Sequence, residues 1–211
     1  MPRKPPSVNE MKKNEKFQEI VRIFRKVEGT SIKQAELFAY ALLTMKDEER
    51  IDFGNTIVKL DEYIHLCKKC NMWHEEESCP ICDDKTRDIQ KVLIVNDYRL
   101  VNNFEKTGKY RGLYFVIHDA VSVNTTPETR QEDLLRLADI VRINKVNEVI
   151  LGFDPTQFGD VNALYVEESL RKTNVKITRL GRGVPTGGLL TSLDLSSLEE
   201  SLANRTKERK N

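Results

Sequence analysis

The stretch CKKCNMWHEEESCPIC, residues 67–82, contains all four cysteines of the 211-residue chain. It has two Cys-x-x-Cys hooks, Cys67 with Cys70 and Cys79 with Cys82, separated by eight residues. Two hooks this close together can wrap one tetrahedral ion with four thiolates. Because four thiolates complete the coordination shell and leave no position for water, the pattern predicts one structural Zn²⁺ ion.

Disulfides, redox chemistry and another metal are the alternative uses of these cysteines. Residues 1–6 lack the apolar region of a secretory signal, and no apolar run is long enough to span a bilayer. We therefore expect a cytoplasmic protein with no membrane contact, and cysteine clusters in that compartment usually hold metal. His65 and His74 lie near the hooks, but four thiolates already satisfy the ion, so neither is expected to be a ligand.

Positive charge is concentrated at the two ends of a chain that is nearly neutral overall. Lysine and arginine number 34 against 33 acidic residues, and the hydrophobic fraction of 39% is sufficient for a core. Residues 1–26 hold eight basic and three acidic residues, which is +5, and residues 204–211 hold four and one, which is +3. Basic ends suit contact with phosphate, although they can also serve solubility alone.

Apolar residues at helical spacing predict a helical first third of the chain. We expect one helix from residue 17, a second from residue 32 and a third over 46–65, with a tight turn at Gly29 between the first two. In the third helix the side chains expected to face inward are Ile51, Ile57, Val58, Leu60 and Ile64.

The remainder of the chain alternates short β-branched runs with helical segments, which predicts βαβ units and a parallel sheet. The expected strands are 91–95, 112–117, 148–153 and 175–178, and the expected helices are 98–106, 128–144, 159–172 and 196–205. Leu134, Leu135, Leu137, Ala138 and Val141 are expected on the buried side of their helix, and Ser196 is expected to cap the last helix.

The predicted fold class is therefore α/β in several parts. A flexible basic N-terminus (1–14) precedes a helical domain (15–63), a four-cysteine zinc module (64–88) and an α/β domain with a parallel sheet (89–173). A C-terminal segment (174–211) adds a strand, a Gly-rich loop, a helix and a basic tail.

Polar residues gather where the predicted strands end, and ligands of open α/β sheets bind at that edge. The strand ends read Asn96-Asp97, His118-Asp119 and Asp154, and Asp160 opens the next helix. Converging carboxylates suit Mg²⁺ and phosphoryl transfer, whereas aspartate at a strand end also serves as a turn former or helix cap. The loop 181–188 matches neither glycine pattern of nucleotide-binding loops and is interpreted as a structural turn.

The order of these parts resembles the RecR family of bacterial recombination mediators over residues 15–205. Besides the cysteine spacing, the specific pieces are Cys82-Asp-Asp-Lys-Thr-Arg87-Asp88, Phe104-Glu-Lys-Thr-Gly-Lys-Tyr-Arg-Gly-Leu-Tyr114 and Thr178-Arg-Leu-Gly-Arg-Gly-Val-Pro-Thr-Gly-Gly188. The resemblance implies a helix-hairpin-helix domain, a zinc module, a Toprim domain and a Walker-B-like strand. It also implies a non-enzymatic dimer or ring-like tetramer that clamps DNA and, with RecO-like and RecF-like partners, helps to load recombinase on single strands.

The hairpin departs from the family pattern at two positions. Gly29 and the DNA-contacting Lys33 are kept, but Ser31 stands in place of a glycine and Leu37 in place of an arginine. Because the turn offers backbone N–H groups and cations to a phosphate, its DNA binding is expected to be weaker than in the family. The cations expected to compensate are Arg22, Arg25 and Lys26.

The strand end of the Toprim domain departs as well. Asn96 stands where the superfamily has a glutamate, which removes a carboxylate needed for metal-dependent catalysis. Asp160 keeps an acid at a position that contributes to partner binding in the family, and with Asp154 it forms the expected partner site.

The sequence thus predicts a non-enzymatic, nucleoid-associated recombination mediator that binds single- and double-stranded DNA without sequence preference. Two alternatives stay open. One is a Toprim-type nuclease that uses Asp97, Asp154 and Asp160 with Mg²⁺. The other is a protein adaptor that has lost DNA binding.

Overall fold

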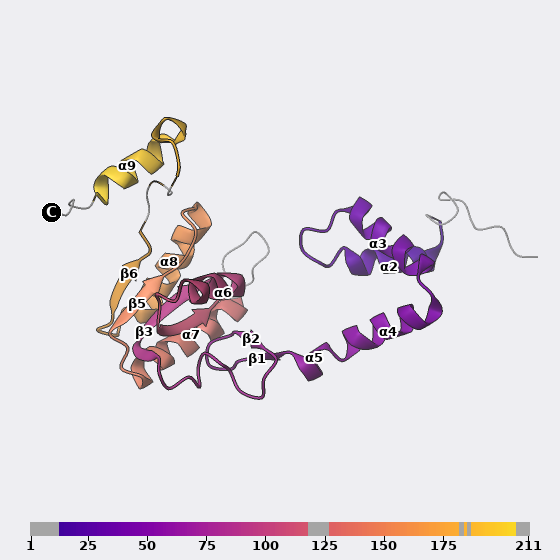
Figure 1. The fold of residues 1–211 in the computed structure, drawn as a ribbon, viewed down its shortest axis with the longest axis horizontal. Helices are drawn as coiled ribbons and strands as arrows, with labels where there is room; N and C mark the ends of the chain where they lie inside the picture. Colours follow the sequence, from indigo (N-terminus) through magenta and orange to yellow (C-terminus); the bar gives the residue numbers. More distant parts are fainter. Residues whose placement is uncertain (1–12, 118–126, 182–183, 185–186, 206–211) are drawn as a thin grey trace, which may run out of the picture. The chain divides into compact units, whose positions relative to one another are not determined.

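The computed structural model describes residues 13–117, 127–181, 184 and 187–205, without the side chains of 127–130. The chain divides into two compact units, Met1–Tyr63 and Ile64–Asn211 (Figure 1). In the described ranges, no helix is both long enough and apolar enough to cross a membrane.

The first unit consists of helices α2 (Glu15–Phe24), α3 (Ile32–Thr44), α4 (Asp47–Val58) and α5 (Leu60–Tyr63). Side-chain caps begin the first two helices. The Phe17 N–H donates to Asn14 at 3.1 Å, and Ser31 and Gln34 form a reciprocal capping box. Between these helices Gly29 has a φ of +77°, a left-handed conformation that favours glycine, so the predicted tight turn is confirmed.

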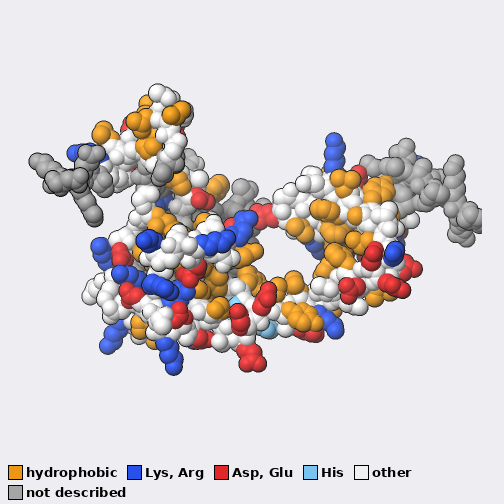
Figure 2. All heavy atoms as spheres, in the orientation of Figure 1, with side chains coloured by type: hydrophobic (Ala, Val, Ile, Leu, Met, Phe, Trp, Pro, Cys, Tyr) orange, Lys and Arg blue, Asp and Glu red, His pale blue; other side chains and the backbone are white. Residues whose placement is uncertain are grey.

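The core of the first unit is small and lies between α2 and α3. It consists of Phe17, Val21, Ala35 and Ala39, and the Phe17 ring lies 4.8 Å from that of Tyr40. The predicted third helix is wrong in two respects, because it is broken at Lys59 and its apolar face is not covered. Ile51, Ile57, Val58 and Leu60 are all more than half exposed. Figure 2 shows hydrophobic side chains on the visible surface of this unit.

The second unit contains a parallel four-stranded sheet of order β4-β3-β5-β6. Its strands are β3 (Asp88–Val95), β4 (Gly112–Val116), β5 (Glu148–Leu151) and β6 (Lys176–Arg179), and its helices are α6 (Tyr98–Thr107), α7 (Pro127–Ile143) and α8 (Gln157–Leu170). A two-residue antiparallel pair, β1 (His65–Leu66) with β2 (Trp73–His74), precedes the sheet. The predicted βαβ order and parallel pairing are confirmed.

Alternate residues of the strands face two different layers. Val92, Ile94 and Phe115 pack with Leu137 of α7, and the same cluster includes Val166 and Leu170 of α8. On the other face Leu93, Val95, Tyr114 and Val116 pack with Val101 of α6 and with Cys67, Cys70 and Cys79. The cysteine module therefore covers the sheet as a helix would. One predicted core residue of α7 is wrong, because Leu135 is exposed.

The chain continues through the short helix η1 (Leu190–Ser192) into α9 (Leu195–Ala203). The predicted cap at Ser196 is wrong: Asp194 accepts a hydrogen bond from the Ser197 N–H at 2.8 Å, so the helix begins earlier. Aspartate and serine are comparably good caps, so cap preference alone does not decide between Asp194 and Ser196. His118 and Asp119, and residues 182–183 and 185–186 of the Gly-rich loop, lie outside the described residues.

Candidate metal centre and sheet edge

The four cysteine sulfurs lie together between the hooks and the sheet. Cys67 Sγ is 3.8 Å from Cys82 Sγ, Cys70 Sγ is 3.6 Å from Cys79 Sγ, and all four lie within 4.8 Å of one another. A tetrahedron of thiolates bound at about 2.3 Å has edges of about 3.8 Å. The spacing therefore fits one four-coordinate ion. In the part of the chain that the structure describes, no other group of three or more possible ligands has such a geometry.

The sulfurs interact too strongly for all four to carry charge by themselves. A hydrogen bond with Cys70 holds the pKa of Cys67 far below its ordinary value, and the same contact raises the pKa of Cys70. Four thiolates at these distances repel one another unless a cation lies between them. Ion binding therefore releases protons, and metal affinity is expected to fall as the pH is lowered.

Asn71 shapes the first hook. Its φ of 60° is left-handed, a conformation that asparagine tolerates better than most residues. This turn lets the Asn71 N–H donate to the Cys67 carbonyl at 2.9 Å, and the Cys67 N–H donate to the Met72 carbonyl at 2.8 Å. The Lys69 N–H lies 3.4 Å from Cys67 Sγ, where it favours the thiolate form.

The same hook closes the edge of the sheet at β4. The Val116 N–H donates to the Cys70 carbonyl at 2.9 Å, and the Asn71 amide donates to the Val116 carbonyl at 2.9 Å. The Asn71 amide also donates to Asp133 of α7 at 2.8 Å, and Asp133 pairs with Arg136. An uncovered strand edge is a template for unwanted pairing, so the four-cysteine module also protects β4 near Val116. No local sequence pattern marks Asn71 or Asp133 for this role.

A buried ion pair joins the end of the metal module to α6. The Arg87 guanidinium is 5% exposed and donates to both carboxylate oxygens of Glu105, at 3.0 and 2.6 Å. It also donates to the Gly112 carbonyl at 3.2 Å, and the Tyr114 hydroxyl donates to Glu105 at 2.6 Å. The Arg87 guanidinium holds the pKa of Glu105 below its ordinary value, and burial raises the pKa of Tyr114. Two of the motifs that carried the resemblance therefore meet in one cluster.

Two of the predicted acids at the carboxyl edge of the sheet form ion pairs with arginines. Asp97 caps α6 by accepting a hydrogen bond from the Arg99 N–H at 2.8 Å, and it also pairs with the Arg99 guanidinium. Asp160 of α8 lies 2.7 Å from Arg179 of β6. Each arginine neutralises a carboxylate that a Mg²⁺ site needs. Asn96 adds no charge, and its side-chain oxygen is buried without a hydrogen bond to any described residue.

Asp154 presents a different environment from the other two acids. Its side chain is exposed, and its carbonyl is so close to Gly159 that a Cβ there would lie 2.0 Å from the oxygen. Asp154 lines a pocket of about 630 Å³, whose walls combine apolar side chains with polar side chains from the start of α9. The apolar ones are Leu100, Phe104, Phe153 and Leu180, and the polar ones are Asp194, Ser196, Ser197 and Glu200. A hollow that mixes apolar and polar side chains suits contact with another protein.

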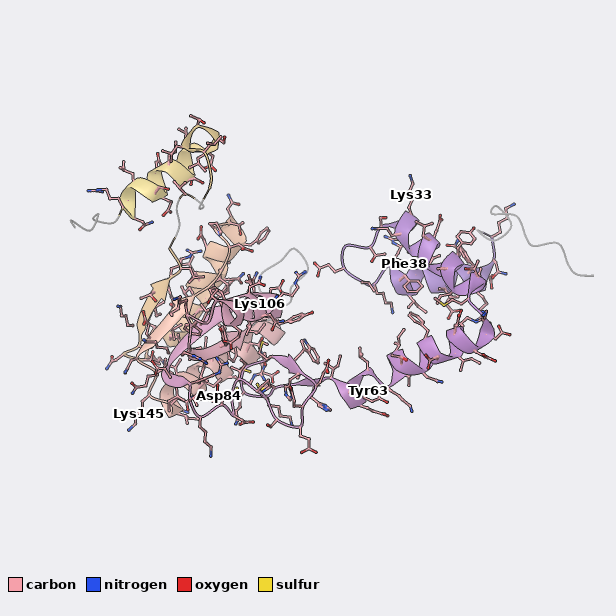
Figure 3. The ribbon with its side chains drawn as sticks, in the orientation of Figure 1. Lys33, Phe38, Tyr63, Asp84, Lys106 and Lys145 are labelled. Carbon is pink, nitrogen blue, oxygen red and sulfur yellow. The ribbon has the colours of Figure 1, made fainter. Side chains whose placement is uncertain are left out.

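The four candidate DNA-contacting cations lie on either side of the 27–31 turn. Arg22, Arg25, Lys26 and Lys33 are all exposed. Figure 3 shows Lys33 projecting away from the helices of the first unit. The capping box at the start of α3 occupies two backbone donors of this turn: the Ser31 N–H donates to Gln34 Oε1 at 2.9 Å, and the Gln34 N–H donates to Ser31 Oγ at 3.3 Å. These two N–H groups are therefore not offered to a phosphate.

A parallel sheet with cover on both faces, joined to four clustered cysteines that could bind a metal ion, defines an α/β protein with a small cysteine module. Residues 90–181 match the Toprim domain family. The chain is 30% identical over 193 residues to "Recombination protein RecR" of Staphylococcus haemolyticus (strain JCSC1435), a match that covers 92% of this chain and 98% of that protein. The protein of the same name from Staphylococcus aureus (strain MRSA252) is 29% identical with the same coverage. The chain belongs to the RecR family, and the resemblance is confirmed.

Proposed function

We propose that this protein is a non-enzymatic mediator of recombination in DNA repair. It binds the DNA backbone, assembles as a homodimer or tetramer, and receives RecO-like and RecF-like partners to promote recombinase loading on single-stranded DNA. The observation that carries the proposal is the cysteine module docked on the edge of a Toprim sheet, in a chain of the RecR family. The relatives named for recombination support the role. We infer that a protein with this role acts in the cytoplasm at the nucleoid.

We infer that the ion is Zn²⁺, held by Cys67, Cys70, Cys79 and Cys82. Four thiolates at tetrahedral spacing favour zinc over hard ions such as Mg²⁺, which prefer oxygen. When bound, the ion supplies no open coordination position and serves to fix the two hooks. The division into residues 1–14, 15–63, 64–88, 89–173 and 174–211 stays a prediction, supported at one border by the boundary between Tyr63 and Ile64.

The pairing of two predicted acids with arginines favours a non-enzymatic role over the nuclease alternative. The nuclease alternative needs Asp97, Asp154 and Asp160 around one ion. Two of these carboxylates are instead paired with Arg99 and Arg179. For partner binding, Asp154 is the stronger candidate of the two acids. The charge of the Asp160 carboxylate is already neutralised by Arg179, so a partner would contact the two side chains as a pair.

For DNA binding, the exposed cations Arg22, Arg25, Lys26 and Lys33 support direct contact with phosphates. The capping box favours the adaptor alternative, because it removes backbone donors from the turn. The two functions differ in salt dependence. A contact with phosphate displaces counterions, so its loss flattens the decline of affinity with salt.

The test compares wild type with Lys33→Ala in titrations of DNA affinity at several salt concentrations. We expect the variant to bind more weakly at low salt and to lose about one unit of the slope of log affinity against log salt. The matched control is Lys106→Ala, another exposed lysine on a helix (Figure 3), which should leave the slope unchanged. If the wild-type protein shows no salt-sensitive affinity for DNA, the adaptor alternative is correct. If it cleaves DNA when Mg²⁺ is added, the nuclease alternative is correct.

A further inference from the structure

We propose that Cys82 is a site of oxidation by small organic hydroperoxides, which reach it through an apolar pocket beside the metal centre. The inference rests on the pocket and on the proposed metal site, and not on the proposed roles in DNA or partner binding.

Cys82 differs from the other three cysteines in its access. Cys67, Cys70 and Cys79 are 7%, 2% and 5% exposed, whereas Cys82 is only partly buried. Cys82 and Cys70 line a pocket of about 320 Å³. The other walls are mostly apolar: Ile89, Leu113, Ile140 and Ile143 line the pocket together with Lys69, Tyr114 and Asn144. The pocket therefore places a largely hydrocarbon surface beside the sulfur of a proposed metal ligand.

The lining selects the class of oxidant. Hydrogen peroxide is small and polar, so hydrocarbon walls give it no favourable contact. An alkyl or aryl hydroperoxide can place its hydrocarbon part against the isoleucines and its peroxide group at the sulfur, and the volume is in the range of small-molecule sites. Cys82 thus becomes the cysteine that such an oxidant meets first.

The chemistry balances with the hydroperoxide as the two-electron oxidant. The Cys82 thiolate attacks the terminal peroxide oxygen, an S–O bond forms and the O–O bond breaks, and the alkoxide takes up a proton to leave as an alcohol. Cys67 Sγ lies 3.8 Å away and then attacks Cys82 Sγ. The S–S bond forms as the S–O bond breaks, and the departing hydroxide takes up a proton to become water.

The product is a Cys67–Cys82 disulfide that joins the two hooks and removes two of the four thiolates. The remaining pair, Cys70 and Cys79, cannot complete a tetrahedral shell, so the ion is released. Because the first hook also covers β4, oxidation is expected to loosen the edge of the sheet near Val116.

The experiment treats the reduced full-length protein with cumene hydroperoxide and, separately, with hydrogen peroxide at equal concentration. Zinc release is followed with a chromogenic chelator, sulfenic acid is trapped with dimedone, and disulfides are mapped by mass spectrometry. We expect cumene hydroperoxide to react faster, the first dimedone adduct to lie on Cys82, and the first disulfide to join Cys67 with Cys82. An adduct that appears first on another cysteine, or a first disulfide within one hook, overturns the proposal.

Two variants on α7 test the pocket itself. Ile143 lines the pocket, and Leu135 is similarly exposed on the same helix but does not line it. We expect Ile143→Trp to fill the pocket and slow the cumene hydroperoxide reaction about tenfold, and the hydrogen peroxide reaction less than about twofold, since only the organic oxidant loses apolar contact. Leu135→Trp should react as wild type does with both oxidants. Equal slowing of both oxidants by Ile143→Trp, or no slowing of either, contradicts a route through this pocket.

Discussion

At the residue scale, Asn71 joins the four-cysteine module to the sheet. Its backbone supplies the left-handed turn of the first hook, and its side chain donates to β4 and to α7. A replacement therefore has two separable effects, on the backbone conformation and on the hydrogen bonds. Glycine keeps the left-handed backbone conformation and loses the side-chain hydrogen bonds, whereas alanine disfavours that conformation and loses the hydrogen bonds as well.

We expect Asn71→Ala to lower the free energy of unfolding by about 3 kcal/mol, because it strains the turn, leaves the Val116 carbonyl without its side-chain donor and removes one of the donors to Asp133. Asn71→Gly should cost about 1 kcal/mol less, since glycine adopts a positive φ without strain. Urea denaturation of the three proteins with excess metal measures both values. Equal losses in the two variants would show that the turn carries no strain with alanine.

Some of these residues could be predicted from the sequence and others could not. The four cysteines could be predicted as metal ligands because both Cys-x-x-Cys hooks lie within one short stretch of the chain. The partners of Asn71 could not be predicted, because Val116 and Asp133 lie 45 and 62 residues away along the chain. The ion pair of Asp160 with Arg179 joins α8 to β6, and the local sequence around either residue does not predict this pair.

At the scale of elements, the Arg87–Glu105 pair ties the metal module to α6. The order and type of the strands and helices of the α/β domain were predictable from hydrophobic patterning. The link between the module and the domain was not, because the ion pair depends on how β4 brings Tyr114 and Gly112 beside Arg87. The prediction that the apolar side chains of α4 face inward was wrong for a related reason. Periodicity shows that one face of a helix is apolar, but it does not show that another part of the same chain covers that face.

The ion pair makes stability depend on pH in a definite direction. The folded pKa of Glu105 lies below its ordinary value of 4.5, so its contribution is complete above that pH and is lost as the pH falls through the lower folded value. We expect Glu105→Gln to be less stable than wild type by about 2 kcal/mol at neutral pH. The difference should shrink below about pH 4.5.

Thermal unfolding of both proteins over a pH series measures this difference. Loss of metal in acid is common to the two proteins, so their difference isolates Glu105. A difference that stays constant into strong acid would mean that the charge of Glu105 does not stabilise the fold.

At the scale of the whole molecule, the exposed apolar side chains of the first unit require an explanation. The small core of α2 and α3 leaves Ile51, Ile57, Val58 and Leu60 in contact with solvent, and such patches usually mark interfaces. The proposed homodimer or tetramer supplies the missing cover, because a two-fold contact lets the same patch bury itself against a second copy.

Val58 is the most exposed of these side chains, at 78%, so a charge there should disturb the assembly without disturbing the fold of the unit. We expect Val58→Glu to lower the mass measured by light scattering during size-exclusion chromatography, because the assembly would have to bury an unpaired carboxylate. Leu135→Glu, which places the same charge on an exposed position of α7, should keep the wild-type mass. A wild-type protein that is already monomeric would remove the oligomer from the proposed function. An oligomer that survives Val58→Glu intact would place its interface away from Val58.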